Sequence, residues 1–299
     1  MNTRNLRFRS NCVRDIIRLF HEELDELYGA GEVGVFIEML FEAFLGWDKV
    51  RLLTSKEQTI DQSDLLRFHW ALEDLKQYRP IQHITGYTDF CGCRIEVNPE
   101  VLIPRPETEE IVQWIISNID KEPLSILDLC TGSGCIAIAL KKAFPGAETY
   151  GVDISAAALE TARQNGKNND VDVSFEKRDV LNYKDNLTSY DLIVSNPPYV
   201  KESEKAQMQR NVLEYDPAVA LFVPDEDPLL FYKAIAKIAK GKLKEGGLLV
   251  VEINEALANE TARIFREQGM VGVIHRDFRG KERWIAVKKS GYRDNGISE

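Results

Sequence analysis

The sequence predicts an α/β protein whose main part is a seven-stranded, mostly parallel, doubly wound sheet. After residue 124, apolar runs typical of strands alternate with amphipathic helical segments, an order that favours a parallel sheet covered by helices on both faces. The last two strand-like runs are separated only by the short turn 279–282, so the sheet should end in an antiparallel hairpin at one edge. The first 78 residues show helical periodicity only, which predicts a separate helical bundle.

These patterns divide the chain into three parts. Residues 1–78 are expected to form the bundle, residues 79–103 a β-hairpin linker, and residues 104–299 the sheet domain. Within the linker, Gly86 and Gly92 indicate turns around the alternating polar and apolar residues that follow. A length of 299 residues is enough for two domains, one of them with a substantial core.

The bundle is predicted from apolar residues that recur three and four positions apart. The first stripe ends at Gly29 and the second near Gly46, while Asp61 or Ser63 caps a later helix that Pro80 closes. Each stripe is one-sided, so these helices must pack against one another. No catalytic pattern occurs in them, and we expect this part to recognise a substrate. The stripes are Val13, Ile16, Ile17, Phe20, Leu24 and Leu27; Phe36, Leu40, Ala43 and Phe44; and Leu65, Phe68, Leu72 and Leu75.

The sheet domain is predicted to have seven strands, with helices following the first five. One helix begins at the glycine turn after the first strand, one is capped by Ser155, one opens at Asp227-Pro228, and the last ends at Gly269. The predicted strands are Ser125–Leu129, Glu148–Ile154, Val171–Lys177, Asp191–Ser195, Leu248–Ile253, Val271–Phe278 and Arg283–Lys288.

Composition and charge exclude several classes of protein. The net charge of −10 argues against sequence-independent binding of nucleic acid phosphates, which needs clustered Lys and Arg. No apolar run approaches the roughly 18 residues that cross a bilayer, and the segment from Met1 to Ser10 lacks the apolar stretch of a secretory signal. We therefore expect a cytoplasmic protein. The five cysteines and four histidines are irregularly spaced, so we predict neither a disulfide framework nor a metal site.

The stretch Asn196-Pro197-Pro198-Tyr199 follows the apolar run Asp191–Ser195. Neither proline has an N–H group, and both fix φ, so the turn is rigid and its carbonyls are unpaired. Such a turn can hold a planar amino group, whose two hydrogens are accepted by the Asn196 side chain and the Pro197 carbonyl while the Tyr199 ring covers its face. Alternatively, it is a strand-ending turn whose aromatic residue packs for stability.

A glycine-rich turn lies between the first predicted strand and the next helix. Its glycines let the backbone turn sharply and approach a ligand, and the N–H groups of the helix point toward that ligand. Asp128 is expected to face a cationic amino group of the ligand, or alternatively to cap the N–H groups of the loop. The residues of the turn are Cys130, Thr131, Gly132, Ser133 and Gly134.

Two further aspartates end strands of the same sheet. Asp153 ends the second strand, where an acidic residue suits the hydroxyls of a ribose, and this arrangement also satisfies the dinucleotide-binding pattern of dehydrogenases. Asp179 and Val180 follow the third strand, placed to contact an adenine ring. Since the carboxyl ends of these strands surround a switch point of the sheet, one ligand site is predicted there. A dehydrogenase would leave the Asn-Pro-Pro-Tyr turn unexplained.

Together these residues resemble the S-adenosylmethionine-dependent methyltransferases with an Asn-Pro-Pro-aromatic motif, which methylate either amino groups of nucleic acid bases or the side-chain amide of glutamine. More closely, the chain resembles the HemK/PrmC family of peptide chain release factor glutamine methyltransferases over nearly its whole length. It departs from the family at Cys130, where glycine is usual, and at Asp216, where glutamate is common. The matching segments are Pro80–Gly86, Leu102–Glu109, Ile126–Gly134, Ser195–Tyr199 and Tyr215–Pro217, followed by Ala220 and Leu221.

The resemblance implies a class I methyltransferase fold and methylation of N5 of the glutamine in the Gly-Gly-Gln motif of class I release factors, in translation termination. It implies S-adenosylmethionine as cofactor, release factors as partners, and neither stable nucleic acid binding nor a membrane. A nucleic-acid methyltransferase and a non-catalytic binding scaffold are the alternatives. By the resemblance, Asn196, Pro197 and Tyr199 are catalytic, Asn196, Pro197, Pro198 and Tyr199 bind the substrate, and the cofactor contacts Asp128, Cys130, Thr131, Gly132, Ser133, Gly134, Asp153, Asp179, Val180 and Asn196.

Two more segments are expected near the cleft. The Pro-Arg-Pro sequence at 104–106 should place its side chains there, although Arg105 could instead pair with Glu107 on the surface. Residues 201–227 carry few regular signals and directly follow the Asn-Pro-Pro-Tyr turn. Loops of this length are commonly functional, so we expect a mobile wall over the substrate cleft, with a plain surface insertion as the alternative.

Overall fold

A computed structural model describes residues 8, 10–119, 121–184 and 189–289. Residues 1–7 and 9, which belong to the segment expected not to be a secretory signal, lie outside the described part. The chain forms two compact units. One comprises residues up to Gly86 together with Arg210–Tyr215, and the other comprises the residues from Tyr87 to Gln209 together with those from Asp216 onward.

The first unit is helical, as the apolar stripes predict. Most side chains of these stripes, among them Phe20, Phe68 and Leu72, belong to one buried cluster, which Phe41 also joins, whereas Leu27 of the first stripe is exposed. A segment from much later in the chain, α9, belongs to the same unit, and the hydroxyl of Tyr215 donates a hydrogen bond to the carbonyl of Gln77 (3.1 Å). The helices are α1 (Val13–Tyr28), α2 (Ala30–Leu45), α3 (Lys49–Thr54), α4 (Gln62–Lys76), α5 (Ile81–Thr85) and α9 (Arg210–Tyr215).

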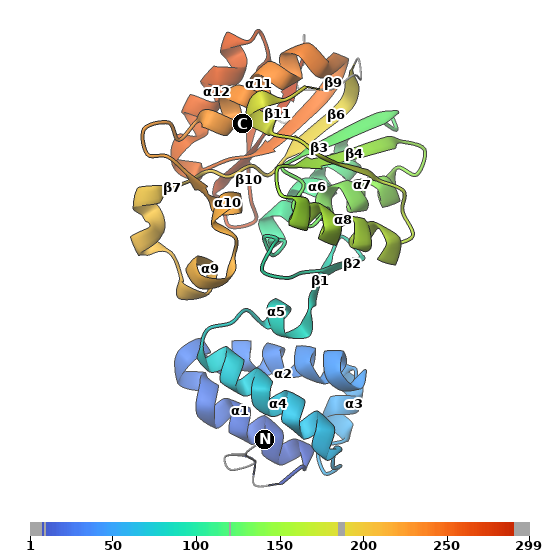
Figure 1. The fold of residues 1–299 in the computed structure, drawn as a ribbon, viewed down its shortest axis with the longest axis vertical. Coiled ribbons are helices and arrows are strands. Elements are labelled where there is room, and N and C mark those ends of the chain that lie inside the picture. Colours follow the sequence, from blue (N-terminus) through green and yellow to red (C-terminus); the bar gives the residue numbers. More distant parts are fainter. Residues whose placement is uncertain (1–7, 9, 120, 185–188, 290–299) are drawn as a thin grey trace. The chain divides into compact units, whose positions relative to one another are not determined.

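The second unit contains a seven-stranded sheet in the order β10-β11-β9-β6-β3-β4-β5 (Figure 1). Strands β9, β6, β3, β4 and β5 run parallel, whereas β11 is antiparallel to both of its neighbours, so the predicted hairpin at the edge is confirmed. The sheet strands are β3 (Ser125–Leu129), β4 (Glu148–Asp153), β5 (Ser174–Lys177), β6 (Tyr190–Ser195), β9 (Leu243–Glu252), β10 (Val271–Arg276) and β11 (Glu282–Lys288).

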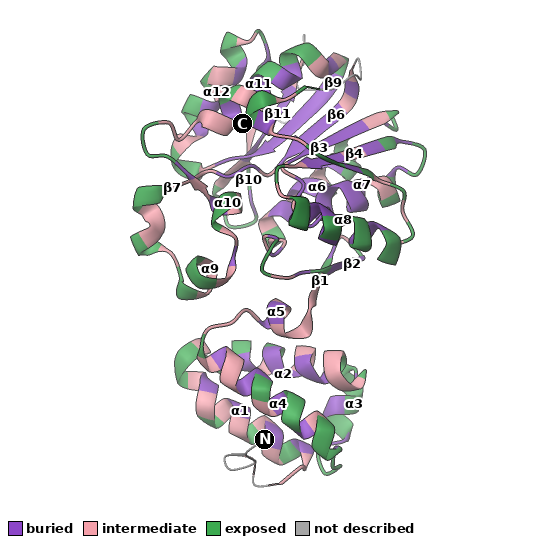
Figure 2. Ribbon diagram, viewed as in Figure 1, coloured by how far each residue is buried: buried purple, intermediate pink, exposed green. Residues whose placement is uncertain are grey.

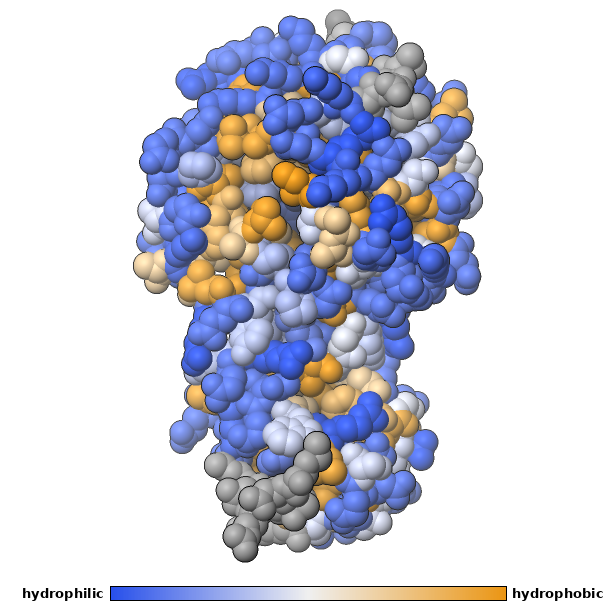
Figure 3. Space-filling model, in the orientation of Figure 1, coloured by the Kyte–Doolittle hydropathy of each residue, from blue (hydrophilic) through white to orange (hydrophobic). Residues whose placement is uncertain are grey.

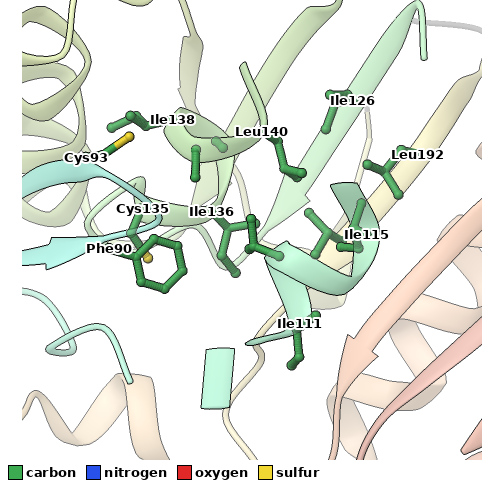
Figure 4. Packing of buried hydrophobic residues seen from close by; sticks show 14 of the residues in the cluster. Phe90, Cys93, Ile111, Ile115, Ile126, Cys135, Ile136, Ile138, Leu140 and Leu192 are labelled. Atoms are coloured by element: carbon green, nitrogen blue, oxygen red, sulfur yellow. The ribbon is translucent and has the colours of Figure 1, made fainter. Parts of the chain in front are cut away.

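Helices cover both faces of this sheet, and the inner strands β3, β6, β9 and β11 are largely buried, whereas the edge strands β5 and β10 are more exposed (Figure 2). Alternate residues of each strand point to opposite faces. Ile126 and Leu192 pack with α6, α7 and α8 on one face (Figure 4), whereas Leu127 and Ile193 pack with α11 and α12 on the other. The helices are α6 (Pro106–Asn118), α7 (Cys135–Ala143), α8 (Ala156–Asn168), α11 (Leu230–Lys242) and α12 (Ala258–Glu267).

The remaining elements are short. The predicted hairpin is formed by β1 (Tyr87–Phe90) and β2 (Cys93–Glu96), which pair antiparallel. The segment expected to be a loop, 201–227, in fact contains several short elements in addition to α9. These elements are β7 (Val200–Lys201), the 3₁₀ helix η2 (Glu202–Gln207), α10 (Ala218–Leu221) and β8 (Phe222–Val223); a further 3₁₀ helix, η3 (Glu255–Leu257), precedes α12.

Two expectations about helices were wrong. No α-helix follows β5 in the described residues: the connection to β6 holds only the 3₁₀ helix η1 (Val180–Asn182), with residues 185–188 outside the described part. The helix expected at Asp227-Pro228 begins later, at Leu230, because the Asp227 carbonyl accepts a turn hydrogen bond from the Leu230 N–H and its side chain pairs with Lys233. Within the described ranges, no helix is long and apolar enough to cross a membrane.

Candidate active site

A cavity of about 310 Å³ opens at the carboxyl ends of the parallel strands, within the sheet unit. It lies where the chain, after running outward from β3 through β4 to β5, returns to β6 on the other side of β3, which is where doubly wound sheets bind ligands. Apolar side chains gather on the face of this unit that carries β7 and α10 (Figure 3). The wall contains Cys130, Thr131, Gly132, Ser133, Asp153, Asp179, Val180, Asn196 and Pro198 among the predicted residues.

The glycine turn forms one wall because its backbone adopts a conformation that side chains disfavour. Cys130, Gly132 and Gly134 all have positive φ, of 60°, 54° and 81°. A Cβ atom on Gly134 would lie 2.9 Å from the Phe175 ring, so only glycine fits there. The left-handed conformation at Cys130 also accounts for the glycine usual at this position in the HemK/PrmC family.

Asp153, at the end of β4, holds the loop directly. One carboxylate oxygen accepts a hydrogen bond from the Gly132 N–H (2.9 Å) and the other from the Ser155 N–H (2.9 Å). Each oxygen has a second lone pair that remains available to a hydroxyl of a ligand. Asp153 therefore fixes the loop and still presents acceptors to the cavity that it lines.

Asp179 and Val180 lie on the neighbouring part of the wall. The Asp179 carboxylate accepts hydrogen bonds from the Leu181 N–H (2.9 Å) and from the Asn182 side chain (2.7 Å). These bonds cap the start of η1. Val180 is buried against the core, and Leu181 also lines the cavity. The turn thus offers a carboxylate and apolar surface side by side, as a flat aromatic ring requires.

Asp128 lies elsewhere than expected. Its side chain is completely buried, it accepts a hydrogen bond from the Thr131 hydroxyl (2.5 Å), and it is not part of the cavity wall. The expectation that its carboxylate faces the amino group of a ligand is therefore corrected. Its role is closer to the alternative, in which Asp128 stabilises the loop, because its carboxylate accepts the hydrogen bond from the Thr131 side chain of that loop.

Replacement of Asp128 by asparagine should make the free energy of unfolding less sensitive to a rise in pH between about 4 and 7. Burial raises the pKa of Asp128 to about 7, so the folded protein binds this proton more tightly than the unfolded chain does. Wild-type stability should therefore fall as pH rises from about 4 toward 7, and the neutral amide of Asp128→Asn avoids this loss. Urea unfolding from pH 5 to pH 8 should show the variant gaining stability relative to wild type, by about 3 kcal/mol, because about two pH units of this range lie below the folded pKa of about 7. A difference independent of pH would contradict this assignment.

The Asn-Pro-Pro-Tyr turn ends β6 at the edge of the cavity. Asn196 and Pro198 line it, and the side-chain nitrogen of Asn196 donates a hydrogen bond to the Thr108 hydroxyl (3.2 Å). Tyr199 packs against the core between the sheet and α11, and its hydroxyl donates to Glu252 (3.0 Å). Asn254 also donates to the Tyr199 carbonyl (3.2 Å). The turn is therefore held from both ends by side chains of the sheet unit.

Arg105 confirms that the Pro-Arg-Pro segment reaches the cleft. It lines the cavity and pairs with Asp216 (2.5 Å) rather than with Glu107. Burial raises the pKa of the Asp216 carboxyl, and the Arg105 charge opposes that rise. The Asp216 side chain, although shorter than that of a glutamate, reaches Arg105 at the cavity wall. The pair fixes the segment 201–227 at the point where it returns to the sheet unit.

Several residues of the wall were not predicted individually. The segment 201–227 was expected as a mobile wall; Val219, Ala220 and Phe222 do line the cavity, and the mobility stays a prediction. Nothing in the local sequence singles out these three residues. Ile154 and Ala158 belong to the start of α8, whose position next to the second strand end was a usable signal. The residues missed by the sequence analysis are Glu100, Val101, Leu102, Thr108, Cys135, Ile136, Ile154, Ser155, Ala158, Arg178, Leu181, Val219, Ala220, Phe222 and Phe231.

Comparison with known proteins gives similarities over both units. A family model described as PrmC N-terminal domain matches residues 18–86, and one described as Methyltransferase small domain matches residues 109–217. A release factor glutamine methyltransferase of Flavobacterium psychrophilum is 41% identical over 273 residues, covering 90% of this chain and 96% of the relative. The protein of the same name from Bacteroides thetaiotaomicron is 39% identical over 277 residues, covering 92% and 99%.

Among solved structures, a methyltransferase from Pyrococcus furiosus superimposes with a TM-score of 0.50 at 19% sequence identity. The match covers 67% of this chain and 90% of that structure. At this identity the similarity concerns the fold alone, and it agrees with a class I methyltransferase sheet.

Proposed function

The chain belongs to the release factor glutamine methyltransferase family, and we propose that it methylates N5 of the glutamine in the Gly-Gly-Gln motif of class I release factors, with S-adenosylmethionine as the methyl donor. One observation carries this proposal. Asn196, whose side chain can hold an amide, lines the same cavity as the glycine turn and Asp153, which suit the methyl donor. In this proposal the donor and acceptor sites share one cavity.

The described residues fit S-adenosylmethionine. Gly132, at positive φ, brings the backbone to the cavity wall, and the acceptor oxygens of Asp153 suit ribose hydroxyls. We assign the adenine to the wall formed by Asp179 and Val180, and the rest of the donor to the turn Cys130–Gly134. When bound, S-adenosylmethionine supplies an electrophilic methyl group on a positively charged sulfur.

The acceptor nitrogen presents a particular chemical difficulty. An amide nitrogen is a weak nucleophile because its lone pair is delocalised into the carbonyl, and its protons are too weakly acidic for a side-chain base to remove first. We therefore assign a positional role to the Asn-Pro-Pro-Tyr turn. The Asn196 side-chain oxygen and the Pro197 carbonyl accept the two amide hydrogens and aim the nitrogen. These acceptors also stabilise the positive charge that develops on it.

Pro198 completes the proposed acceptor site, whereas Tyr199, which was predicted to cover the substrate, is not part of the cavity wall and packs against the core. Pro198 lines the cavity, and the Tyr199 ring is held in place by the hydrogen bond from its hydroxyl to Glu252. Two glycines beside the substrate glutamine allow a narrow loop to enter such a site. Because release factors act in translation termination, we propose a cytoplasmic location, and the net charge of −10 favours a protein substrate over nucleic acid.

The test is a methyl-transfer assay with S-adenosylmethionine labelled in its methyl group. The full-length protein is incubated separately with a class I release factor, with the same factor carrying Gln→Ala in its Gly-Gly-Gln motif, and with DNA. Mass spectrometry of the products should show one added methyl on the motif glutamine of the first sample only. Label on DNA and never on that glutamine would refute the proposal.

A further inference from the structure

A buried carboxylate lies behind the Asn-Pro-Pro-Tyr turn. Glu252, the last residue of β9, is 2% exposed. One of its oxygens accepts a hydrogen bond from the Thr108 hydroxyl (2.7 Å) and the other accepts one from the Tyr199 hydroxyl (3.0 Å). Thr108, in the first turn of α6, is itself 2% exposed. Neither Thr108 nor Glu252 was singled out by the sequence pattern as a site residue.

The number of hydrogens that each group can donate determines which group is the donor in these contacts. Burial raises the pKa of Glu252, whereas the Thr108 and Tyr199 hydroxyls and the charge of Arg283 oppose that rise. In its ionised form Glu252 has no hydrogen to give, so Thr108 donates its single hydroxyl hydrogen to it. Toward Asn196, Thr108 can then only accept, and Asn196 must present its NH₂ group to it (3.2 Å). The carbonyl oxygen of Asn196 is consequently at the other end of the planar amide. A carboxylate at position 252 thus decides which end of Asn196 is available to a ligand.

This direction matters because an asparagine amide is nearly symmetric in shape. Rotation by 180° about its last side-chain bond exchanges oxygen and nitrogen with little change in packing. The rotated amide would point its NH₂ group at the NH₂ group of a substrate glutamine, so that two donors face each other. Only the orientation dictated by Thr108 offers the acceptor that the proposed reaction requires.

We propose that Thr108 and Glu252 are positioning residues that hold the Asn196 side chain in its acceptor orientation toward the methylated amide. The inference rests on the proposed amide methylation and adds the reason why the acceptor oxygen, and not the nitrogen, meets the substrate. Glu252 also holds Tyr199, so one carboxylate orders both ends of the turn. Glu252 can contact both residues because it ends β9, the strand next to β6, and the Asn-Pro-Pro-Tyr turn follows the end of β6.

The test compares three substitutions at Thr108 in the full-length protein. Thr108→Val keeps the shape of the side chain and removes the hydroxyl. If this variant does not fold, Thr108→Ala, which removes the hydroxyl and the methyl group, takes its place. Thr108→Ser keeps the hydroxyl. Loss of one neutral hydrogen bond corresponds to about a 3- to 10-fold change. We expect kcat to fall by this factor in Thr108→Val or Thr108→Ala, to stay within about twofold of wild type in Thr108→Ser, and KM for the release factor to change little.

Two further measurements separate positioning from general damage. The Kd for S-adenosylhomocysteine, measured by calorimetry, should stay within about twofold of wild type in all three variants. Thr261→Val serves as matched control, because Thr261 is also buried and, among the described residues, its hydroxyl bonds to the Leu257 carbonyl just ahead of α12 (2.8 Å), away from the cavity. This control should lose some thermal stability and keep its kcat.

A double mutant tests whether Thr108 acts through Asn196. Once Asn196 is alanine there is no amide to orient, so adding Thr108→Val should lower kcat by less than about twofold more. Independent effects that multiply in the double mutant, or a Thr108→Val enzyme with wild-type kcat, would overturn the positioning role. An absence of glutamine methylation by the wild-type protein would instead refute the proposed function, so the two failures are distinguishable.

Discussion

Replacement of Asn196 by alanine is expected to lower kcat for glutamine methylation by at least about tenfold, with the Kd for S-adenosylhomocysteine within about twofold of wild type. The reason is that Asn196 supplies an acceptor for the amide hydrogens and so aims the nitrogen. The methyl donor is assigned mainly to the glycine turn, Asp153 and Asp179, which this substitution leaves in place. Steady-state kinetics with a release factor and calorimetry with S-adenosylhomocysteine measure the two quantities independently.

The control for this experiment is Asn118→Ala. Asn118 is an exposed residue at the end of α6, and its side chain donates a hydrogen bond to the Trp114 carbonyl (2.9 Å), away from the cavity. We expect this variant to keep the wild-type kcat. Equal turnover in Asn196→Ala and wild type would refute the role assigned to Asn196, whereas a loss of S-adenosylhomocysteine binding would show that Asn196 also supports the donor site.

The inner strands β3 and β6 were predictable because they are buried on both faces and therefore appear as apolar runs, whereas β5 buries only Phe175. The order of apolar runs and glycine turns also placed the ligand site, since carboxyl ends of parallel strands meet at one edge. The connection after β5 was not predictable in this way. Its only described helical element is the three-residue η1, which Asp179 caps with its side chain, and so short a turn carries no periodicity.

Asp128 shows a limit of assigning a side chain from its place near a turn. It lies between Leu127 and Leu129 in β3, and these two pack on the face covered by α11. Alternation therefore directs Asp128 to the opposite face, beneath α7, where it is buried. The alternation was present in the sequence, and applying it to the last strand residues would have given the observed placement.

The contact between Thr108 and Glu252 could not have been predicted from local pattern. The two residues are 144 positions apart, and they meet because α6 begins beside the end of β9. Each appears ordinary in the sequence: a threonine near a helix start and a glutamate at the end of an apolar run. Only the arrangement of the folded sheet shows that both lie behind Asn196.

Replacement of Asp153 by alanine should weaken binding of the methyl donor, whereas Asn196→Ala should lower turnover. The Asp153 carboxylate accepts the Gly132 and Ser155 N–H groups, both at 2.9 Å, and is assigned to the ribose hydroxyls. Hydrogen bonds to a charged group contribute about 1.5–3 kcal/mol each, so the Kd for S-adenosylhomocysteine should rise by about 10- to 100-fold. Calorimetry measures this rise. At saturating donor, the kcat of Asp153→Ala should lie much closer to the wild-type value than the kcat of Asn196→Ala does, because the acceptor side of the cavity is unchanged.

The control here is Asp172→Ala, which removes an exposed carboxylate ahead of β5 without touching the cavity wall. It tests whether the loss of one negative charge by itself alters donor binding, and we expect no change in Kd. An unchanged Kd in Asp153→Ala would remove Asp153 from the donor site and leave it as a loop-holding residue only. Together with Asn196→Ala, the variant separates the two halves of the cavity: substitutions on the β4 side should change donor affinity, and those at the end of β6 should change turnover.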